Sequence, residues 1–158
     1  MVLPNDKNAA LAARYIRALV ISTTLVSIGI SSAAAKSSDS TLHFAKGAVT
    51  SVVTDKLAPH TDEQWYRFDA ASQQYAVINI APLAGTPETA NVGVLHMPDG
   101  TQDGTKGGII YQGCLPKTGK YRLRIARNLM ATHGKTAGYK VEVMILPKVA
   151  SQSLCKPA

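Results

Sequence analysis

The sequence predicts an all-β protein, a single antiparallel β-sandwich of about seven or eight short strands that follows a cleaved N-terminal signal helix. Two observations lead to this fold class. Apolar and polar residues alternate with a period of two through most of the chain after residue 41, and Gly, Pro and Asp turns separate the alternating stretches. Outside the leader, no amphipathic helix of useful length interrupts this pattern.

Residues 1–35 have the pattern of a secretory signal peptide. Positively charged residues precede an uncharged run, Ala18–Ile30, and the small residues Ala33-Ala34-Ala35 then supply an A-x-A cleavage signal. The run is shorter than the roughly 20 apolar residues that a membrane-spanning helix needs, which disfavours the alternative of an uncleaved anchor. We therefore expect cleavage before Lys36.

The remaining chain, residues 36–158, has a length that suits one domain. Residues 36–41 (KSSDST) are polar and predict a disordered lead-in, and residues 42–158 predict the β-sandwich. The leader carries three of the 17 Lys and Arg residues and one of the ten acidic residues, so the formal net charge falls from +7 to +5. We expect a periplasmic or secreted protein that makes no membrane contact after cleavage.

Four strands are predicted before residue 98. The first, Val49–Val53, is rich in β-branched residues, which favour strands. The next two, Trp65–Phe68 and Tyr75–Ile80, alternate between two faces, as half-buried strands do. The fourth, Val92–Met97, ends at Pro98-Asp99-Gly100, which is a strong turn signal.

Three more strands are predicted after this turn, at Ile109–Tyr111, Tyr121–Ala126 and Tyr139–Ile145. The last two alternate strictly. Every second residue from Tyr121 and from Tyr139 is apolar and is expected to point inward, whereas Arg122 and Arg124 are expected to point outward.

Two longer segments between these strands are expected to be loops. Residues 99–108 (DGTQDGTKGG) are too rich in glycine for a regular element, and residues 128–138 (NLMATHGKTAG) join the last two strong strands. The chain contains no internal repeat that would indicate a second copy of the same unit.

Cys114 and Cys155 are the only two cysteines. An even count in an exported chain favours one disulfide, which would tie the C-terminal tail to the segment that begins at Cys114. The alternative is a pair of reduced, buried thiols. No C-x-x-C or H-x-x-x-H spacing is present, so the sequence predicts no metal site, and no motif indicates a cofactor.

The segment CLPKTGKYRLRIARN, residues 114–128, contains a Gly-Lys pair but is not a phosphate loop. Five residues separate Gly113 from Gly119 where the motif requires four, and Tyr121 occupies the position of the metal-binding hydroxyl. Nucleic-acid binding is also not expected, because Tyr121 and Tyr139 fall on apolar strand faces and leave no aromatic surface for base stacking. Arg122 and Arg124 are interpreted as the solvated side of a strand.

Catalytic activity is not expected either. The chain has no G-x-S-x-G motif, and its four histidines are widely spread without ligand or catalytic spacing. Asp99 and Asp103 lie in a glycine-rich loop but lack the register of a calcium-binding loop. The sequence therefore predicts that the protein is not an enzyme.

Residues 44–80 and 114–145 resemble the small exported bacterial inhibitors of goose-type and invertebrate-type lysozymes. They also resemble the broader β-sandwich module called the bacterial pre-peptidase C-terminal domain. Four motifs carry the resemblance: Y-x-F at Tyr66–Phe68, P-D-G at Pro98–Gly100, L-P-x-[ST]-G-x-Y at Leu115–Tyr121, and R-N-x-x-A at Arg127–Ala131. The third motif followed by the fourth is the most specific part of the pattern.

The resemblance implies a lysozyme as partner. In the invertebrate-type inhibitors an S-G-x-Y loop enters the lysozyme cleft and meets the catalytic carboxylates. By position, that loop corresponds here to Thr118, Gly119, Lys120 and Tyr121, and we add Arg127 to this predicted partner-binding set. Hydroxyl donation to an ionised carboxylate is stronger than a neutral hydrogen bond, and threonine keeps the hydroxyl of the family's serine.

Other interpretations stay open. The Leu115–Tyr121 motif is equally the turn and first strand residues of the pre-peptidase module, with no inhibitory role. The chain can instead be a non-catalytic envelope or carbohydrate-binding sandwich, in which Trp65 beside Arg67 stacks on a sugar ring, or an accessory module of a secreted partner. A homodimer is a further state that the sequence leaves open. The positive charge gives no long-range attraction to a basic lysozyme.

Overall fold

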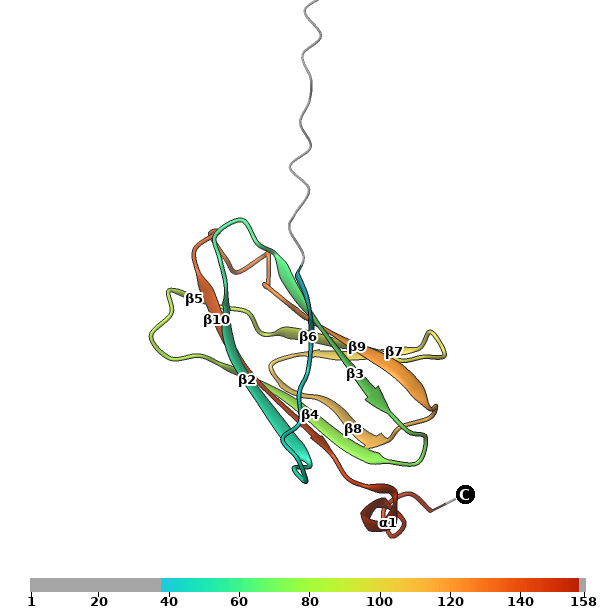
Figure 1. The fold of residues 1–158 in the computed structure, drawn as a ribbon. Coiled ribbons are helices and arrows are strands. Elements are labelled where there is room, and N and C mark those ends of the chain that lie inside the picture. Colours follow the sequence, from blue (N-terminus) through green and yellow to red (C-terminus); the bar gives the residue numbers. More distant parts are fainter. Residues whose placement is uncertain (1–37, 157–158) are drawn as a thin grey trace, which may run out of the picture. The chain divides into compact units, whose positions relative to one another are not determined.

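The computed structural model describes residues 38–156, in which almost all regular structure is β-strand (Figure 1). The predicted signal peptide, residues 1–35, lies outside the described residues. The strands are β1 (Ser38–Thr41), β2 (Thr50–Leu57), β3 (Glu63–Ala70), β4 (Tyr75–Pro82), β5 (Glu88–Thr89), β6 (Val92–His96), β7 (Gln102–Lys106), β8 (Gly108–Cys114), β9 (Gly119–Ala126) and β10 (Ala137–Ile145). One short helix, α1 (Lys148–Ser151), follows them.

The strands form two sheets that pack face to face (Figure 1). The first has the order β1-β3-β9-β6-β7, and the second has the order β2-β10-β4-β8 with β5 beside β10. Most neighbouring strands are antiparallel, but the two short pairs β1–β3 and β5–β10 are parallel. The predicted all-β sandwich is confirmed, with more strands than expected.

The core lies between the two sheets and follows the alternation in the sequence. In β9 the inward side chains of Tyr121, Leu123 and Ile125 are fully buried. In β10 the same is true of Tyr139, Val141 and Val143, and Ile145 is half-buried. The hydroxyl groups of Tyr66 and Tyr139 lie 2.6 Å apart across the core, so the two sheets also share a buried hydrogen bond.

The segment 99–108, predicted as a loop, contains β7 and the start of β8. The β7 strand pairs with β6 in antiparallel register and forms the edge of its sheet. Its side chains are almost all exposed, so it lacks the apolar alternation by which the other strands are recognised. Gly104 suits this strand because a Cβ atom there would lie 2.8 Å from the carbonyl oxygen of Gly93.

The segment 36–41, predicted as a disordered lead-in, also differs. Ser38–Thr41 is β1 and pairs in parallel with β3. Arg67 of β3 forms an ion pair with Asp39 at 3.0 Å, and the N–H of Leu42 donates to the carbonyl of Arg67 at 2.8 Å. The strand is short and polar and gains its order from the edge of β3, which the local sequence does not indicate.

The connections between strands gather at two ends of the sandwich. At the first, which we call the disulfide end, the β3–β4 turn and the end of β8 lie beside α1 and the segment after it, and the β6–β7 turn contacts the β8–β9 turn (Figure 1). At the second, which we call the Arg127 end, the β2–β3 turn, β5 and the β9–β10 loop surround the side chain of Arg127. The predicted partner-binding residues fall at both ends.

Candidate functional site

The predicted binding turn between β8 and β9 is held at the disulfide end by the neighbouring β3–β4 turn. The N–H of Gln73 donates to the carbonyl of Leu115, and the N–H of Leu115 donates to the carbonyl of Gln74, both at 2.9 Å. The side-chain oxygen of Thr118 accepts the N–H of Ser72 at 2.9 Å. Thr118 is exposed, so its hydroxyl both fastens the turn and faces solvent.

The β6–β7 turn supports the same segment from the other side. Gly119 has a φ of 154°, and a Cβ atom there would lie 3.0 Å from two carbons of Pro98. In the same turn, the hydroxyl and the N–H of Thr101 donate to Asp99 at 2.6 and 3.0 Å. These bonds, with the nearby charge of Lys117, hold the pKa of Asp99 below its ordinary value. Three turns therefore form one surface.

Tyr121 lies beneath this surface rather than on it. Its side chain is fully buried and its ring stacks on Phe68 with a centroid distance of 5.5 Å. Its hydroxyl donates to the carbonyl of Lys117 at 2.6 Å, and burial raises its pKa. Tyr121 therefore braces the turn from below, and the groups that the turn presents to solvent are those of Pro116, Lys117, Thr118 and Lys120.

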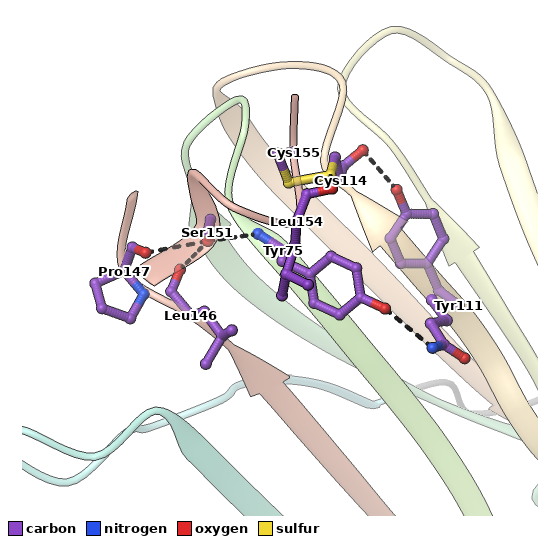
Figure 2. The surroundings of a disulfide bond; sticks show 9 residues. Tyr75, Tyr111, Cys114, Leu146, Pro147, Ser151, Leu154 and Cys155 are labelled. Carbon is purple, nitrogen blue, oxygen red and sulfur yellow. Dashed lines mark hydrogen bonds between the residues drawn. A yellow bond between two sulfur atoms is a disulfide. The ribbon is translucent and has the colours of Figure 1, made fainter. Parts of the chain in front are cut away.

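The predicted disulfide between Cys114 and Cys155 is present, with the two Cα atoms 5.6 Å apart (Figure 2). It joins the last residue of β8 to the segment after α1. A second contact fixes the helix, because Ser151 is fully buried and its Oγ accepts the N–H of Tyr75 at 2.8 Å. The base of the binding turn is thus tied to two distant parts of the chain.

Arg127, the remaining predicted partner-binding residue, is at the opposite end of the sandwich and is only 4% exposed. Its five N–H donors all reach acceptors in the protein. These acceptors are the backbone carbonyls of Leu57, Ala58, Thr61 and Lys135 and the carboxylate of Glu88. The structure therefore gives Arg127 an internal position, where partner binding would need an exposed one.

Glu88 completes this buried cluster at the Arg127 end. One carboxylate oxygen accepts Arg127 at 2.9 Å and the other accepts the N–H of His133 at 2.7 Å. Burial acts to raise the pKa of Glu88, but donation from the His133 and Lys135 N–H groups and the charge of Arg127 outweigh it, so this pKa lies below its ordinary value. Both carboxylate oxygens of Glu88 are therefore bonded within the protein.

The outward face of β3, β9 and β6 carries a cluster that the sequence did not reveal. The guanidinium of Arg122 lies 4.3 Å from the centroid of the Trp65 ring, and His96 contacts the same ring at 5.0 Å. The indole N–H of Trp65 donates to Glu63 at 2.8 Å. In the alternative of a carbohydrate-binding sandwich, Trp65 stacks on a sugar ring beside Arg67, but here Arg122 covers the ring.

The described residues of the disulfide end form no metal-binding group. Within residues 38–156, no group of three or more His, Cys, Asp or Glu side chains could hold a metal ion. The same part of the chain contains no helix long and apolar enough to cross a membrane. What the end presents is a rigid turn with two ammonium groups and a hydroxyl, which suits a partner that offers carboxylates.

Two turns that sequence reasoning did not connect with the site are part of it. Ser72 fastens Thr118, and Pro98 packs against Gly119. The P-D-G motif at residues 98–100 was a visible turn signal, but nothing local showed that it would meet Gly119. The contribution of Ser72 has no sequence signal, because it depends on the register between β3 and β9.

No protein-family profile matches the chain, and no curated protein matches it. Its fold is similar to that of PliG, a periplasmic inhibitor of g-type lysozyme, from three bacteria. For Aeromonas hydrophila PliG the TM-score is 0.55 at 21% identity, covering 70% of this chain and 98% of that one. For Salmonella Typhimurium PliG the TM-score is 0.53 at 22% identity, covering 69% of this chain and 98% of that one. For a mutant of the Escherichia coli protein the TM-score is 0.52 at 22% identity, covering 70% of this chain and 100% of that one. The chain therefore shares the fold of these PliG inhibitors, as its sequence resemblance predicted.

Proposed function

We propose that this protein is an exported, non-catalytic inhibitor of lysozyme, with goose-type enzymes as the first target. The observation that carries the proposal is the similarity of its fold to three PliG proteins, each described as a periplasmic inhibitor of g-type lysozyme. The same likeness and the signal-peptide pattern support a periplasmic or secreted location.

The binding element in this proposal is the Leu115–Tyr121 turn, which would occupy the substrate cleft. Lysozymes cleave their substrate with carboxyl groups that flank the glycosidic bond. Lys117, Thr118 and Lys120 are exposed on the turn and can donate to such carboxylates. Donation from an ammonium to a carboxylate is about twice as strong as a neutral hydrogen bond, so the two lysines are expected to contribute most.

Rigidity of the turn favours this mode of inhibition. The Tyr121 hydroxyl and the Gln73–Leu115 bond hold the turn in one conformation before any partner arrives. Binding then requires less loss of conformational freedom than it would for a mobile loop. In this proposal Tyr121 acts through its hold on the Lys117 carbonyl, and the direct contacts belong to the exposed residues.

A lysozyme panel tests the proposal. Purified residues 36–158 are added to goose-, invertebrate- and chicken-type lysozymes, and the loss of turbidity of a peptidoglycan suspension is followed. We expect near-stoichiometric inhibition of the goose-type enzyme. No inhibition of any of the three would refute the function.

The position of the site is tested with a matched pair of variants. Lys117→Ala/Lys120→Ala removes two charges from the turn, and we expect inhibition to weaken about 10- to 100-fold, the effect of losing charge-assisted bonds. Lys56→Ala/Lys140→Ala removes two charges from exposed positions on β2 and β10. The second variant should inhibit like the parent protein. Equal losses in both variants would show that the turn has no special role.

A further inference from the structure

The outward face of the first sheet has a row of basic side chains. Arg122 of β9 is the register partner of Arg67 on β3 and also of His96 on β6. Side chains that stand directly opposite each other on one face approach closely, and like charges in such pairs are destabilising. Asp39 compensates the charge of Arg67 with an ion pair at 3.0 Å, so the charge of Arg122 is the one in this row that needs a further explanation.

Arg122 is the unusual member of this row. Among the four arginines in residues 38–156, Arg67, Arg124 and Arg127 each have a carboxylate within 3.4 Å, and Arg122 has none. Its guanidinium instead stacks on the Trp65 ring. A cation–π contact fixes the plane of the guanidinium without using its N–H donors, which stay available to an oxyanion.

His96 shows that the surroundings of this row are positively charged. Its Nε2 is buried without a hydrogen-bond partner in the described structure. Burial, followed by the charges of Arg124 and Arg122, lowers the pKa of His96. The surroundings of His96 thus carry more positive charge than Glu63 can balance, and an anion bound to Arg122 would relieve this repulsion.

A shallow hollow continues the row beyond His96. His96 is the register partner of Gln102 on β7, and the hollow covers β6 and β7 with a volume of about 500 Å³. Its lining combines the apolar side chains of Val92 and Val94 with the polar Gln102 and Thr105 and with the opposite charges of Asp103 and Lys106. Gly104 has no side chain to fill it. Apolar and polar groups together suit the ring of a sugar.

We infer that this face, from Arg67 through Arg122 and His96 to the hollow over β6 and β7, binds a carboxylate-bearing polysaccharide. Arg122 is the anchor, because its planar fork matches a carboxylate with two parallel bonds and Trp65 holds it in place. A sugar unit next to the bound carboxylate occupies the hollow. The site is on a sheet face and shares no residue with the turn proposed to bind lysozyme.

Competing ligand classes fit the face less well. Single-stranded nucleic acid needs exposed aromatic rings on which bases stack, and Arg122 covers the ring of Trp65. A neutral glycan would leave the guanidinium of Arg122 without a partner. The carboxylate is therefore the part of the ligand that the face recognises.

The test uses Trp65 as its own reporter, because it is the only tryptophan of the chain. Residues 36–158 are titrated with an oligogalacturonide, a linear carboxylated oligosaccharide, while tryptophan emission and calorimetric heat are recorded. The fully methyl-esterified oligosaccharide has the same rings without the charge. We expect a saturable change of emission with the acid and none with the ester.

Variants then assign the site. Arg122→Gln should weaken calorimetric binding of the acid by about 10-fold or more, as expected for a lost bidentate bond. Lys140→Gln removes one charge from the outward face of the other sheet and should change the affinity by less than about twofold, as for general surface electrostatics. Arg122 is exposed, so its replacement leaves the core intact.

Three results would overturn the inference. Binding of the ester as tight as that of the acid would show that the carboxylate is not recognised. Equal losses in the Arg122 and Lys140 variants would show general electrostatic attraction. Tighter binding of single-stranded DNA than of the oligogalacturonide would assign the face to nucleic acid.

Discussion

The two ends of the sandwich fix their long connections by different chemistry. At the Arg127 end, several segments meet around one buried guanidinium that uses every one of its donors. At the disulfide end, the Cys114–Cys155 bond and the Tyr121 hydroxyl hold a turn whose tip remains exposed. At the Arg127 end the charged groups bond to each other within the protein, whereas at the disulfide end the polar groups of the turn face solvent.

This difference separates an end that stabilises the fold from the end that we propose binds lysozyme. A buried cation is tolerated only when all of its acceptors are in place, so the Arg127 end has to form as a unit. A disulfide and a tyrosine hydroxyl hold the backbone from below and impose no such demand on the exposed side chains. The disulfide end can therefore vary Lys117 and Lys120 without loss of the fold.

The largest expected effect comes from breaking the Arg127 end. Arg127→Leu leaves Glu88 buried without its cation and four carbonyls without a donor. We expect the free energy of unfolding to fall by about 3–5 kcal/mol, the range for removal of one partner of a buried ion pair. Urea denaturation followed by circular dichroism measures it.

The control for this variant is Arg67→Leu. Arg67 pairs with Asp39 at the surface, where its side chain is 42% exposed. The same substitution there should cost at most about 1 kcal/mol. If both variants lose the same stability, the Arg127 end is not held together by its buried cation.

The second largest effect is expected from removing the disulfide. The bond joins residues 41 positions apart, so Cys114→Ser/Cys155→Ser should lower the free energy of unfolding by up to about 4 kcal/mol on the chain-entropy model. Hydrogen exchange should also accelerate at the N–H of Leu115 and of Tyr75, whose partners lie beside the bond. Unchanged exchange at both positions would show that the turn is rigid without the disulfide.

The two ends also differ in how much the sequence could predict. The inward position of Tyr121 follows from strict alternation along β9, and the cysteine pair follows from an even count in an exported chain. Both signals are contained in composition or in a short window. The hydroxyl of Tyr121 was nevertheless assigned to a partner, because its bond to Lys117 depends on how the turn closes.

Arg127 shows why the other end could not be predicted. An arginine directly after a strand normally lies at the surface, since burial of a charge is costly unless it is paired. Here the acceptors come from β2, the β2–β3 turn, β5 and the β9–β10 loop, which meet only in the folded chain. The edge strand β7 was missed for a related reason, because exposed strands carry no apolar alternation.

Alanine substitutions at two glycines compare the backbone strain at the two ends. Gly119→Ala at the disulfide end combines an unfavourable φ of 154° with a 3.0 Å contact to Pro98. Gly134→Ala at the Arg127 end has a φ of 80° with open space around the new methyl group. Both should lower the free energy of unfolding by about 1–3 kcal/mol, with the larger loss at Gly119.

The same pair separates stability from binding. Because Gly119 positions the turn, its alanine variant should also weaken lysozyme inhibition, whereas the Gly134 variant should leave it unchanged. Thermal unfolding and the turbidity assay give the two readouts. A greater loss of stability at Gly134 would show that the contact with Pro98 relaxes easily.

The smallest effect distinguishes the two ends by pH. The pKa of Glu88 lies below its ordinary value of 4.5, so its ionised form stabilises the fold above that value and this contribution is lost as pH falls through the folded-state pKa. The stability difference between the parent protein and Glu88→Gln should therefore be larger at neutral pH than in acid, where both side chains are uncharged.

Ionised Asp99 at the disulfide end should likewise stabilise the fold more at neutral pH than in acid, since its pKa is also lowered. It is exposed, so Asp99→Asn should show a weaker dependence. Urea titrations at a series of pH values measure both. A stability difference for Glu88→Gln that does not shrink in acid would contradict the assignment of this carboxylate as the charged partner of Arg127.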